Sequence, residues 1–349
     1  MGKRVYLDWN ATAPLRAEAR AAMVAAMDVV GNPSSVHAEG RAAKGIIERA
    51  RAQVATALGA DGADVVFTSG ATEAAALALA GRGLQGAPIE HDAVRAWVEP
   101  GLAVDAAGQV TVTEPGRSAL QLANSETGVV QAALPQGLAV SDLTQAFGKI
   151  PFAFNWLGCD AALVSAHKLG GPKGIGALVL RPGIDLSAQI RGGGQEQGRR
   201  AGTENIIGIA GFGAAAEAAA RDLDAGLWDG VAEIRNILEK ALDADSPMTI
   251  FIGNSGPRLP NTLCFATPGW KAETQVMAMD LAGFAISAGS AWSSGKVRAS
   301  PVLGAMGYGA DVAGAAIRVS LGPDVTRDDV LRFAEAWCKQ ERRFRARAA

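Results

Sequence analysis

Residues 165–174, SAHKLGGPKG, place a lysine directly after an apolar run, residues 161–165, that predicts a buried strand. The chain then turns through a glycine-rich loop into a second strand-like run, residues 177–180. Burial at the end of a strand lowers the pKa of a lysine and leaves its amine able to form a Schiff base, which is the role we consider for Lys168. The alternative is that Lys168 and Lys173 are ordinary loop lysines that face water, and this interpretation explains the sequence equally well.

The chain on both sides of this stretch alternates helical patterns with short β-branched runs. We expect helices at 15–30, 39–58 and 74–80, and strands at 64–68, 120–123, 138–141, 161–165 and 177–180. Strands that are separated by helices predict a mostly parallel sheet covered by helices on both faces, and hence an α/β fold.

From about residue 226 the order of elements changes. We expect helices at 227–242, 273–281 and from 328 onward, and strands at 248–252, 262–266, 284–288 and 317–321. That order predicts a smaller α+β domain. The chain is therefore expected to form a large domain, residues 15–225, and a small domain made of residues 1–14 and 226–349.

Residues 68–73, TSGATE, join a strand to a helix through a glycine turn. Such a turn presents unpaired backbone N–H groups and the positive end of a helix dipole, so Ala71 and Thr72 are candidate anion-binding residues. An ordinary helix cap closed by Thr72 or Glu73 is the alternative, and short glycine turns of that kind are common before helices.

Asp142 follows the strand expected at 138–141, and Gln145 comes shortly after it. Open α/β sheets bind ligands at the carboxyl ends of their strands. A pyridoxal phosphate cofactor needs a carboxylate at its ring nitrogen, a phosphate site and a lysine, and His91 could lie flat on such a ring. A lone histidine is more often structural. Arg318 lies within an apolar strand and needs a carboxylate partner, which is either structural or part of a substrate.

The overall composition narrows the classes of function. The chain has 33 Lys and Arg against 35 Asp and Glu, a net charge of −2, so it offers no general field for nucleic acid or for an acidic membrane. Three cysteines in 349 residues do not make a disulfide framework, and no apolar run reaches membrane-spanning length. We expect a cytoplasmic protein with no metal site.

Eight segments resemble the cysteine desulfurases of the nitrogen-fixation and iron–sulfur-assembly type. These proteins belong to the class V aminotransferase family of fold-type I. The segments are YLDWNATAP (6–14), GNPSSVHAEGR (31–41), FTSGATEA (67–74), IEHDAV (89–94), ANSETG (123–128), SAHKLGGPKGIGAL (165–178), GGGQEQGRRAGTEN (192–205) and IRVSLG (317–322). They run along nearly the whole chain in the family's order, and that makes the resemblance highly specific.

The resemblance implies a pyridoxal phosphate enzyme and a role for each matching residue. Lys168 would form the internal aldimine, Asp142 would pair with the pyridinium nitrogen, Gln145 would contact the ring oxygen, and His91 would stack on the ring and take part in catalysis. The remaining cofactor-binding residues would hold the phosphate or lie beside it: Ala71, Thr72, Ser165, His167 and, from the partner subunit, Thr203. Arg318 would bind the substrate carboxylate, with Asn124 nearby. The resemblance also implies a homodimer with sites at its interface, and iron–sulfur assembly proteins as partners.

The loop at residues 287–296, SAGSAWSSGK, departs from the family at one position. Desulfurases carry a cysteine where this chain has Trp292, and that cysteine accepts the substrate sulfur as a persulfide. We expect the indole either to cover the cofactor or to pack into the domain interface. The second is favoured because burying such a side chain stabilises by about 1.5–3 kcal/mol. Cys159, Cys264 and Cys338 are expected to be buried or on a helix surface, so none should replace the missing thiol.

Three smaller departures accompany the first. Ser125 stands where the family usually has an asparagine, Val140 stands where it has a histidine, and the chain is shorter than usual between His91 and Asp142.

These observations leave three hypotheses for the function. The first is a pyridoxal phosphate enzyme that acts on a sulfur or selenium amino acid without a persulfide of its own. The second is a conventional desulfurase that recruits a thiol from a partner protein. The third is a degenerate desulfurase fold that serves as a scaffold or regulator in iron–sulfur cluster assembly.

Overall fold

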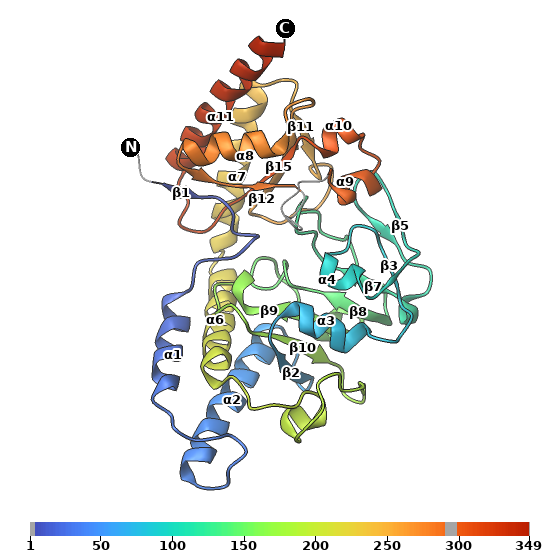
Figure 1. The fold of residues 1–349 in the computed structure, drawn as a ribbon, viewed down its shortest axis with the longest axis vertical. Coiled ribbons are helices and arrows are strands. Elements are labelled where there is room, and N and C mark those ends of the chain that lie inside the picture. The colour runs from blue at the N-terminus through green and yellow to red at the C-terminus, as the bar shows by residue number, and fades with distance from the viewer. Residues whose placement is uncertain (1–3, 290–298, 349) are drawn as a thin grey trace.

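The computed structural model describes residues 4–289 and 299–348 (Figure 1). Within them lie two main sheets, the larger of which has five strands. In spatial order the strands are β2 (Asp64–Thr68), β10 (Gly176–Leu180), β9 (Cys159–Ser165), β8 (Leu138–Asp142) and β7 (Ala119–Gln121). β10 runs antiparallel to both of its neighbours, whereas β9, β8 and β7 pair in parallel. Four of the five strands therefore share one direction, and the predicted α/β class with a mostly parallel sheet is confirmed.

Helices cover both faces of this sheet. On one face lie α2 (Ala38–Ala57) and α6 (Ile206–Asp224), with α1 (Ala17–Met27) packed on α6; on the other lie α3 (Ala71–Leu79) and the short α4 (Asp92–Arg95). Strand β9 divides its side chains between these layers. Ala162 and Val164 join the core under α2 and α6, and Ala161 and Leu163 join the core under α3. Alternating residues that are all apolar are typical of a strand buried on both faces.

Helix α6 was not among the predicted helices. Its sequence is apolar almost all the way round, and ten of its nineteen residues are buried. A buried helix of this kind has no polar face, so the period of 3.6 residues that indicates a surface helix is absent. Gly213 lets it approach α2, because a Cβ there would lie 2.7 Å from the Cα of Ala50.

The second main sheet has four antiparallel strands. Their order is β11 (Ile250–Ile252), β12 (Thr262–Ala266), β15 (Ala316–Ser320) and β14 (Ser287–Ala288). Three helices pack with this sheet around one core: α7 (Leu227–Asp245), α8 (Ala272–Leu281) and α11 (Arg327–Ala348). The strand predicted at 284–288 is in fact two strands. β13 (Phe284–Ala285) pairs with β1 (Val5–Tyr6), and β14 pairs with β15.

Short elements connect these layers. They are the strand pairs β3 (Gln85–Gly86) with β4 (Glu99–Pro100) and β5 (Ala103–Val104) with β6 (Val110–Thr111), the helices α5 (Phe154–Leu157), α9 (Pro301–Ala305) and α10 (Ala310–Ala313), and three 3-10 turns, Pro115–Arg117, Ala166–Lys168 and Gln195–Gly198.

The N-terminal segment passes from one main sheet to the other. After β1 the chain bridges to β15 at Asp8 and Ser320, and then reaches the end of β9, where the N–H of Ala13 donates to the carbonyl oxygen of His167 at 2.9 Å. Residues 8–13 therefore lie where the two sheets meet, while the predicted domain limits remain a prediction.

Candidate active site

A cavity of about 570 Å³ opens at the carboxyl ends of the parallel strands. β2, β8 and β9 all end at this edge of the sheet, because strands that run the same way finish on the same side. Eight of the residues predicted for the site line the cavity: Ala71, Thr72, His91, Asp142, Gln145, Ser165, His167 and Lys168. The structure thus brings together residues that lie far apart in the sequence.

Lys168 lies in the 3-10 turn that follows β9, and it lines the cavity. Its Nζ donates to the carbonyl oxygens of Asn10 at 2.7 Å and Ala11 at 2.9 Å. Burial, together with the charge of Arg318, lowers the pKa of Lys168 to about 8, although Asp142 and Asp8 act in the opposite direction. The amine is therefore unprotonated in about a tenth of the molecules at pH 7, far more than for a lysine with its ordinary pKa.

Lys173, in contrast, is exposed at the rim of the cavity. Of the two lysines in residues 165–174, Lys173 therefore faces water, as the alternative interpretation predicted. Lys168 instead bonds to the carbonyl oxygens of Asn10 and Ala11.

The N-terminus of α3 faces the same cavity. The helix begins at Ala71, three residues earlier than predicted, so Ala71 and Thr72 lie in its first turn, where backbone N–H groups have no partner within the helix. The Glu73 carboxylate accepts the N–H of Ser69 at 2.8 Å. The predicted alternative, in which Glu73 closes this turn, therefore accounts for one of its backbone N–H groups. The N–H groups of the first turn remain suited to an anion.

His167 adds a neutral side chain beside that turn. Its Nδ1 lies 3.2 Å from the Thr12 hydroxyl. Burial and the nearby lysines, Lys168 foremost among them, lower the pKa of His167 to about 4. At neutral pH the imidazole is therefore uncharged and donates one N–H.

His91 is the N-cap residue of α4. Its Nδ1 accepts the N–H of Ala93 at 3.1 Å. A nitrogen that accepts cannot carry the proton, so the proton of neutral His91 is on Nε2.

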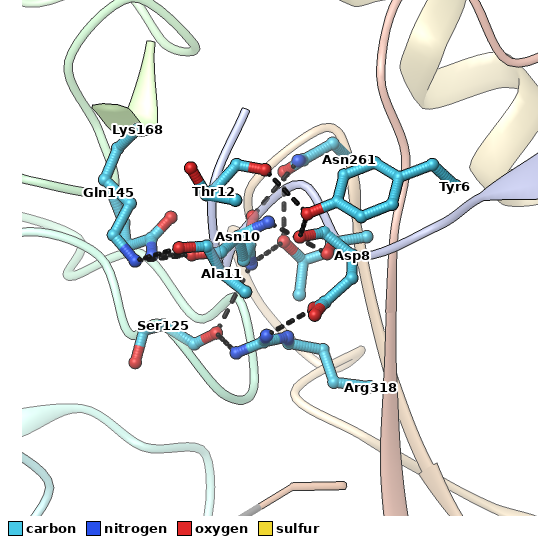
Figure 2. A network of polar contacts seen from close by, with 12 residues as sticks. Tyr6, Asp8, Asn10, Ala11, Thr12, Ser125, Gln145, Lys168, Asn261 and Arg318 are labelled. Carbon is cyan, nitrogen blue, oxygen red and sulfur yellow. Dashed lines mark hydrogen bonds and ion pairs between the residues drawn. The ribbon is translucent and has the colours of Figure 1, made fainter. Parts of the chain in front are cut away.

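The predicted substrate residue Arg318 has a partner within the protein. Its Nη2 bonds to the Asp8 carboxylate at 2.8 Å and its Nη1 bonds to the Ser125 carbonyl oxygen at 2.9 Å (Figure 2). Its Nε is buried and has no hydrogen-bond partner among residues 4–289 and 299–348. Ser125 lines the cavity, and Arg318 lies behind it. The carboxylate that the sequence demanded is thus Asp8, and binding of a substrate carboxylate remains a prediction.

Three further predicted residues lie away from the cavity lining or outside the described chain. Asn124 holds a turn: its Oδ1 accepts the N–H groups of Glu126 and Thr127 at 2.9 and 2.8 Å, and its Nδ2 donates to the Ile89 carbonyl oxygen. Thr203 lines a separate cavity of about 270 Å³ behind the end of β2. Trp292 lies outside the described residues. The roles predicted for all three stay predictions.

Two residues at the site were missed by the sequence analysis, Asn10 and Lys149. The carbonyl oxygen of Asn10 accepts from Lys168 and from Gln145 (Figure 2). The Nδ2 of Asn10 donates to Thr262 Oγ1 at 2.8 Å. Asn10 therefore joins the large sheet to the small one. Lys149 is 2% exposed, and the one signal for it in the sequence is its position among apolar residues at 146–152.

The three cysteines are all buried. Burial raises the pKa of Cys159 to about 12 and that of Cys338 to about 11, and it raises the pKa of Cys264 well above the ordinary value. The expectation that none of them is an accessible thiolate agrees with this.

A family model for class V aminotransferases matches residues 5–94 and 119–333. The chain belongs to the class V aminotransferase family. The residues between the matched parts, 95–118, fall in the segment that the sequence analysis found shorter than usual.

Curated members of the class V aminotransferase family are similar over nearly their whole length. A cysteine desulfurase of Cereibacter sphaeroides is 37% identical, with 95% of this chain and 94% of that protein covered. The cysteine desulfurase IscS of Dictyoglomus turgidum is 33% identical, over 95% and 92%. The crystal structure of a NifS-like protein from Rickettsia africae superposes with a TM-score of 0.86 at 31% identity, covering 96% of this chain and 99% of that one. The predicted fold-type I architecture is confirmed by this match.

No group of three or more potential metal-ligating side chains is found within residues 4–289 and 299–348. In the same parts of the chain, no helix is both long and apolar enough to cross a membrane.

Proposed function

We propose that the chain binds pyridoxal phosphate in the 570 Å³ cavity and acts, as a cysteine desulfurase-like enzyme, on cysteine or a related sulfur or selenium amino acid. The observation that carries the proposal is Lys168, an amine with a pKa of about 8 in the same cavity as Asp142 and the N-terminus of α3. The similarity to cysteine desulfurases supports the substrate class.

The residues of the cavity fit the cofactor at three points. An anionic phosphate suits the N–H groups at the start of α3, with the Thr72 and Ser165 hydroxyls and the neutral His167 as further donors. A protonated ring nitrogen suits Asp142, whose Oδ1 already accepts the N–H of Thr144 at 2.8 Å and is thereby oriented. An aldehyde suits the unprotonated amine of Lys168. When bound, this cofactor supplies an electron sink for the pair left by breaking a bond at the substrate Cα.

The chain's own groups supply the proton transfers and the orientation. Lys168 is the base for the Cα proton, because its lowered pKa lets it take a proton and release it near neutral pH. His91, with its proton on Nε2, supplies a hydrogen-bond donor at the cavity wall. We assign Arg318 to the substrate carboxylate, as the resemblance implies, with Asn124 holding the turn that carries Ser125.

The residue at position 292 bears on which substituent the substrate can lose from its β-carbon. A chain without a thiol at that position favours substrates that expel their β-substituent unaided, such as a sulfinate, a selenol or a persulfide. A thiol from a partner protein would make the same site a conventional desulfurase. Cytoplasmic iron–sulfur assembly proteins are the partner class we propose, on the strength of the resemblance to desulfurases of that type.

A scaffold or regulator of iron–sulfur assembly is the second candidate, because Trp292 replaces the family's sulfur-accepting cysteine. Absorption spectra separate it from the enzyme. An enzyme changes its cofactor spectrum when cysteine, cysteine sulfinate, selenocysteine or cystine is added, and a scaffold that binds cofactor does not. A spectrum that none of the four amino acids alters would contradict the proposed activity.

Cofactor attachment to the cofactor-free protein should accelerate as the pH rises from 7 to 9. The pKa of Lys168 is about 8, so the reactive unprotonated amine grows from about a tenth to about nine tenths of the molecules across this range. Stopped-flow absorbance measures the rate at each pH. Lys173→Ala, which removes the exposed lysine of the same loop, should keep the profile. A rate that keeps rising toward pH 10.5 would mean that the site does not lower the pKa of Lys168.

We propose a homodimer in which Thr203 of each subunit contributes to the cofactor site of the other subunit. Two variant subunits, each defective in a different residue, can then restore one complete site when they pair. Thr203→Ala should weaken cofactor binding about tenfold, the cost of a hydrogen bond to a charged group. When Lys168→Ala and Thr203→Ala subunits are mixed and refolded together, each heterodimer holds one intact site, so about a quarter of all sites should bind tightly again. A monomer by light scattering, or no recovery of tight sites, would contradict the shared site.

A further inference from the structure

Lys149 is a lysine without a carboxylate at hydrogen-bond distance in the described chain, and it is 2% exposed. Its Nζ lies 2.7 Å from Gln145 Oε1 and 3.3 Å from Asn10 Oδ1. Lys149 does not line the cavity, whereas Gln145 does. It therefore stands directly behind a residue of the candidate site.

Lys149 and the Asn10 carbonyl oxygen together set which way the Gln145 amide points. The amine of Lys149 donates in either protonation state and a carbonyl oxygen only accepts, so both are satisfied when Gln145 turns its oxygen to Lys149 and its nitrogen to Asn10. Gln145 Nε2 then donates to the Asn10 carbonyl oxygen at 3.0 Å. The rotated amide would lose the hydrogen bond that Lys149 donates to its oxygen and would place two acceptors face to face at Asn10.

Asn10 is oriented in the same way from its other side. Its Oδ1 accepts from Asn261 Nδ2 at 3.1 Å as well as from Lys149, and its Nδ2 donates to Thr262 Oγ1 at 2.8 Å. The Thr262 hydroxyl in turn donates to Asn261 Oδ1 at 3.0 Å. Each amide in this network thus has an assigned orientation, and the network cannot reverse at one residue alone.

We propose that Lys149 is a positioning residue, which holds the Gln145 amide so that its NH₂ group, and not its oxygen, faces the cavity. Burial lowers the pKa of Lys149 well below its ordinary value, and Lys168 and Arg318 act in the same direction. The amine donates whether or not it is protonated. The inference rests on the proposed function in one respect: the group that meets this donor is the ring oxygen of pyridoxal phosphate.

Lys149→Met keeps the length and apolar stem of the side chain and removes the donor. Without it only the Asn10 carbonyl oxygen orients the Gln145 amide, and the ring oxygen loses part of the stabilisation of its negative charge. The proton shared between that oxygen and the nitrogen linked to Lys168 is then held to higher pH. We expect the midpoint of the absorbance titration of the bound cofactor to rise by about one pH unit and cofactor affinity to fall about tenfold.

Two controls separate positioning from loss of stability. Lys240→Met, at an exposed position of α7, should leave the midpoint unchanged. In a Gln145→Ala background, Lys149→Met should cause no further shift, because the amide that it orients is gone. An unchanged midpoint in Lys149→Met, or an equal shift with and without Gln145, overturns the inference.

A second variant keeps the test decisive when Lys149→Met does not fold. Gln145→Glu is nearly isosteric and offers acceptors only, so it should raise the midpoint by at least as much, and no rise overturns the inference. A wild-type protein that binds no pyridoxal phosphate overturns the proposed function, and the role of Lys149 with it, before any variant is made. Normal binding with an unaltered midpoint in the variants overturns the role of Lys149 alone.

Discussion

Replacement of Lys168 by alanine is expected to abolish covalent attachment of the cofactor and to lower turnover by at least about 10⁴-fold. The loss is large because one amine has two roles, as the attachment point and as the base. Both roles need its pKa of about 8, which comes first from burial. The measurements are the visible spectrum of the purified protein and the rate of product release from its best amino-acid substrate.

Borohydride reduction and peptide mapping locate the attachment directly. In the wild type the reduced adduct should be on Lys168, and in Lys168→Ala the cofactor should be removable by dialysis. Lys173→Ala is the matched control, since Lys173 is in the same loop but exposed. A reduced adduct on Lys173, or on the buried amine of Lys149, together with an unchanged spectrum in Lys168→Ala, would show that the assignment is wrong.

Trp292→Cys is expected to raise sulfide release from L-cysteine by about 10²-fold or more when reductant is present. The wild type should release little without an added thiol acceptor. A thiolate on the protein converts an encounter with an external thiol into a reaction within one complex, which gains orders of magnitude in effective concentration. Serine hydroxyls at the neighbouring positions 293 and 294 cannot accept sulfur in this way.

The chain on both sides of residue 292 favours this outcome. The N–H of Gly289 bonds to the Ala316 carbonyl oxygen at 2.8 Å, and Ser300 caps α9 through the N–H of Leu303 at 3.1 Å. β14, which ends just before Gly289, pairs with β15 at Arg318. The last residues described before position 292 therefore lie beside the strand that carries Arg318, the residue that we assign to the substrate carboxylate.

Removing the three native cysteines completes the experiment. Cys159→Ala, Cys264→Ala and Cys338→Ala, combined, should leave the low wild-type rate as it is, because all three thiols are buried. Robust multiple-turnover desulfuration by the wild type that survives this triple change would contradict the role given to Trp292. An inactive Trp292→Cys protein with a normal cofactor spectrum would mean that the site has lost more than the thiol.

Local pattern was sufficient for most elements of the fold. The strands at 64–68 and 262–266 coincide with β2 and β12 to the residue, because each is a short apolar run bounded by residues that break strands. Helix α6 escaped prediction for the opposite reason, since a helix that is buried all round has no amphipathic period. The division of 284–288 into β13 and β14 depends on two different partner strands, which no local pattern contains.

For the candidate site, the sequence was sufficient to predict most of the residues that line the cavity, and the hydrogen bonds between them follow from the tertiary structure. Lys168, Asp142 and the turn at 68–73 could be named in advance, because strand ends and helix starts are local features and parallel strands bring them to one edge. Asn10 could not, because its hydrogen bonds join residues 135 to 251 positions apart. Lys149 is only four residues from Gln145, but its place in the network also depends on Asn10, 139 positions away. The partner of Arg318 was likewise open between a substrate and the protein, until the fold brought Asp8 to 2.8 Å from it. Long-range hydrogen bonds depend on how the elements pack, and packing is a property of the whole chain.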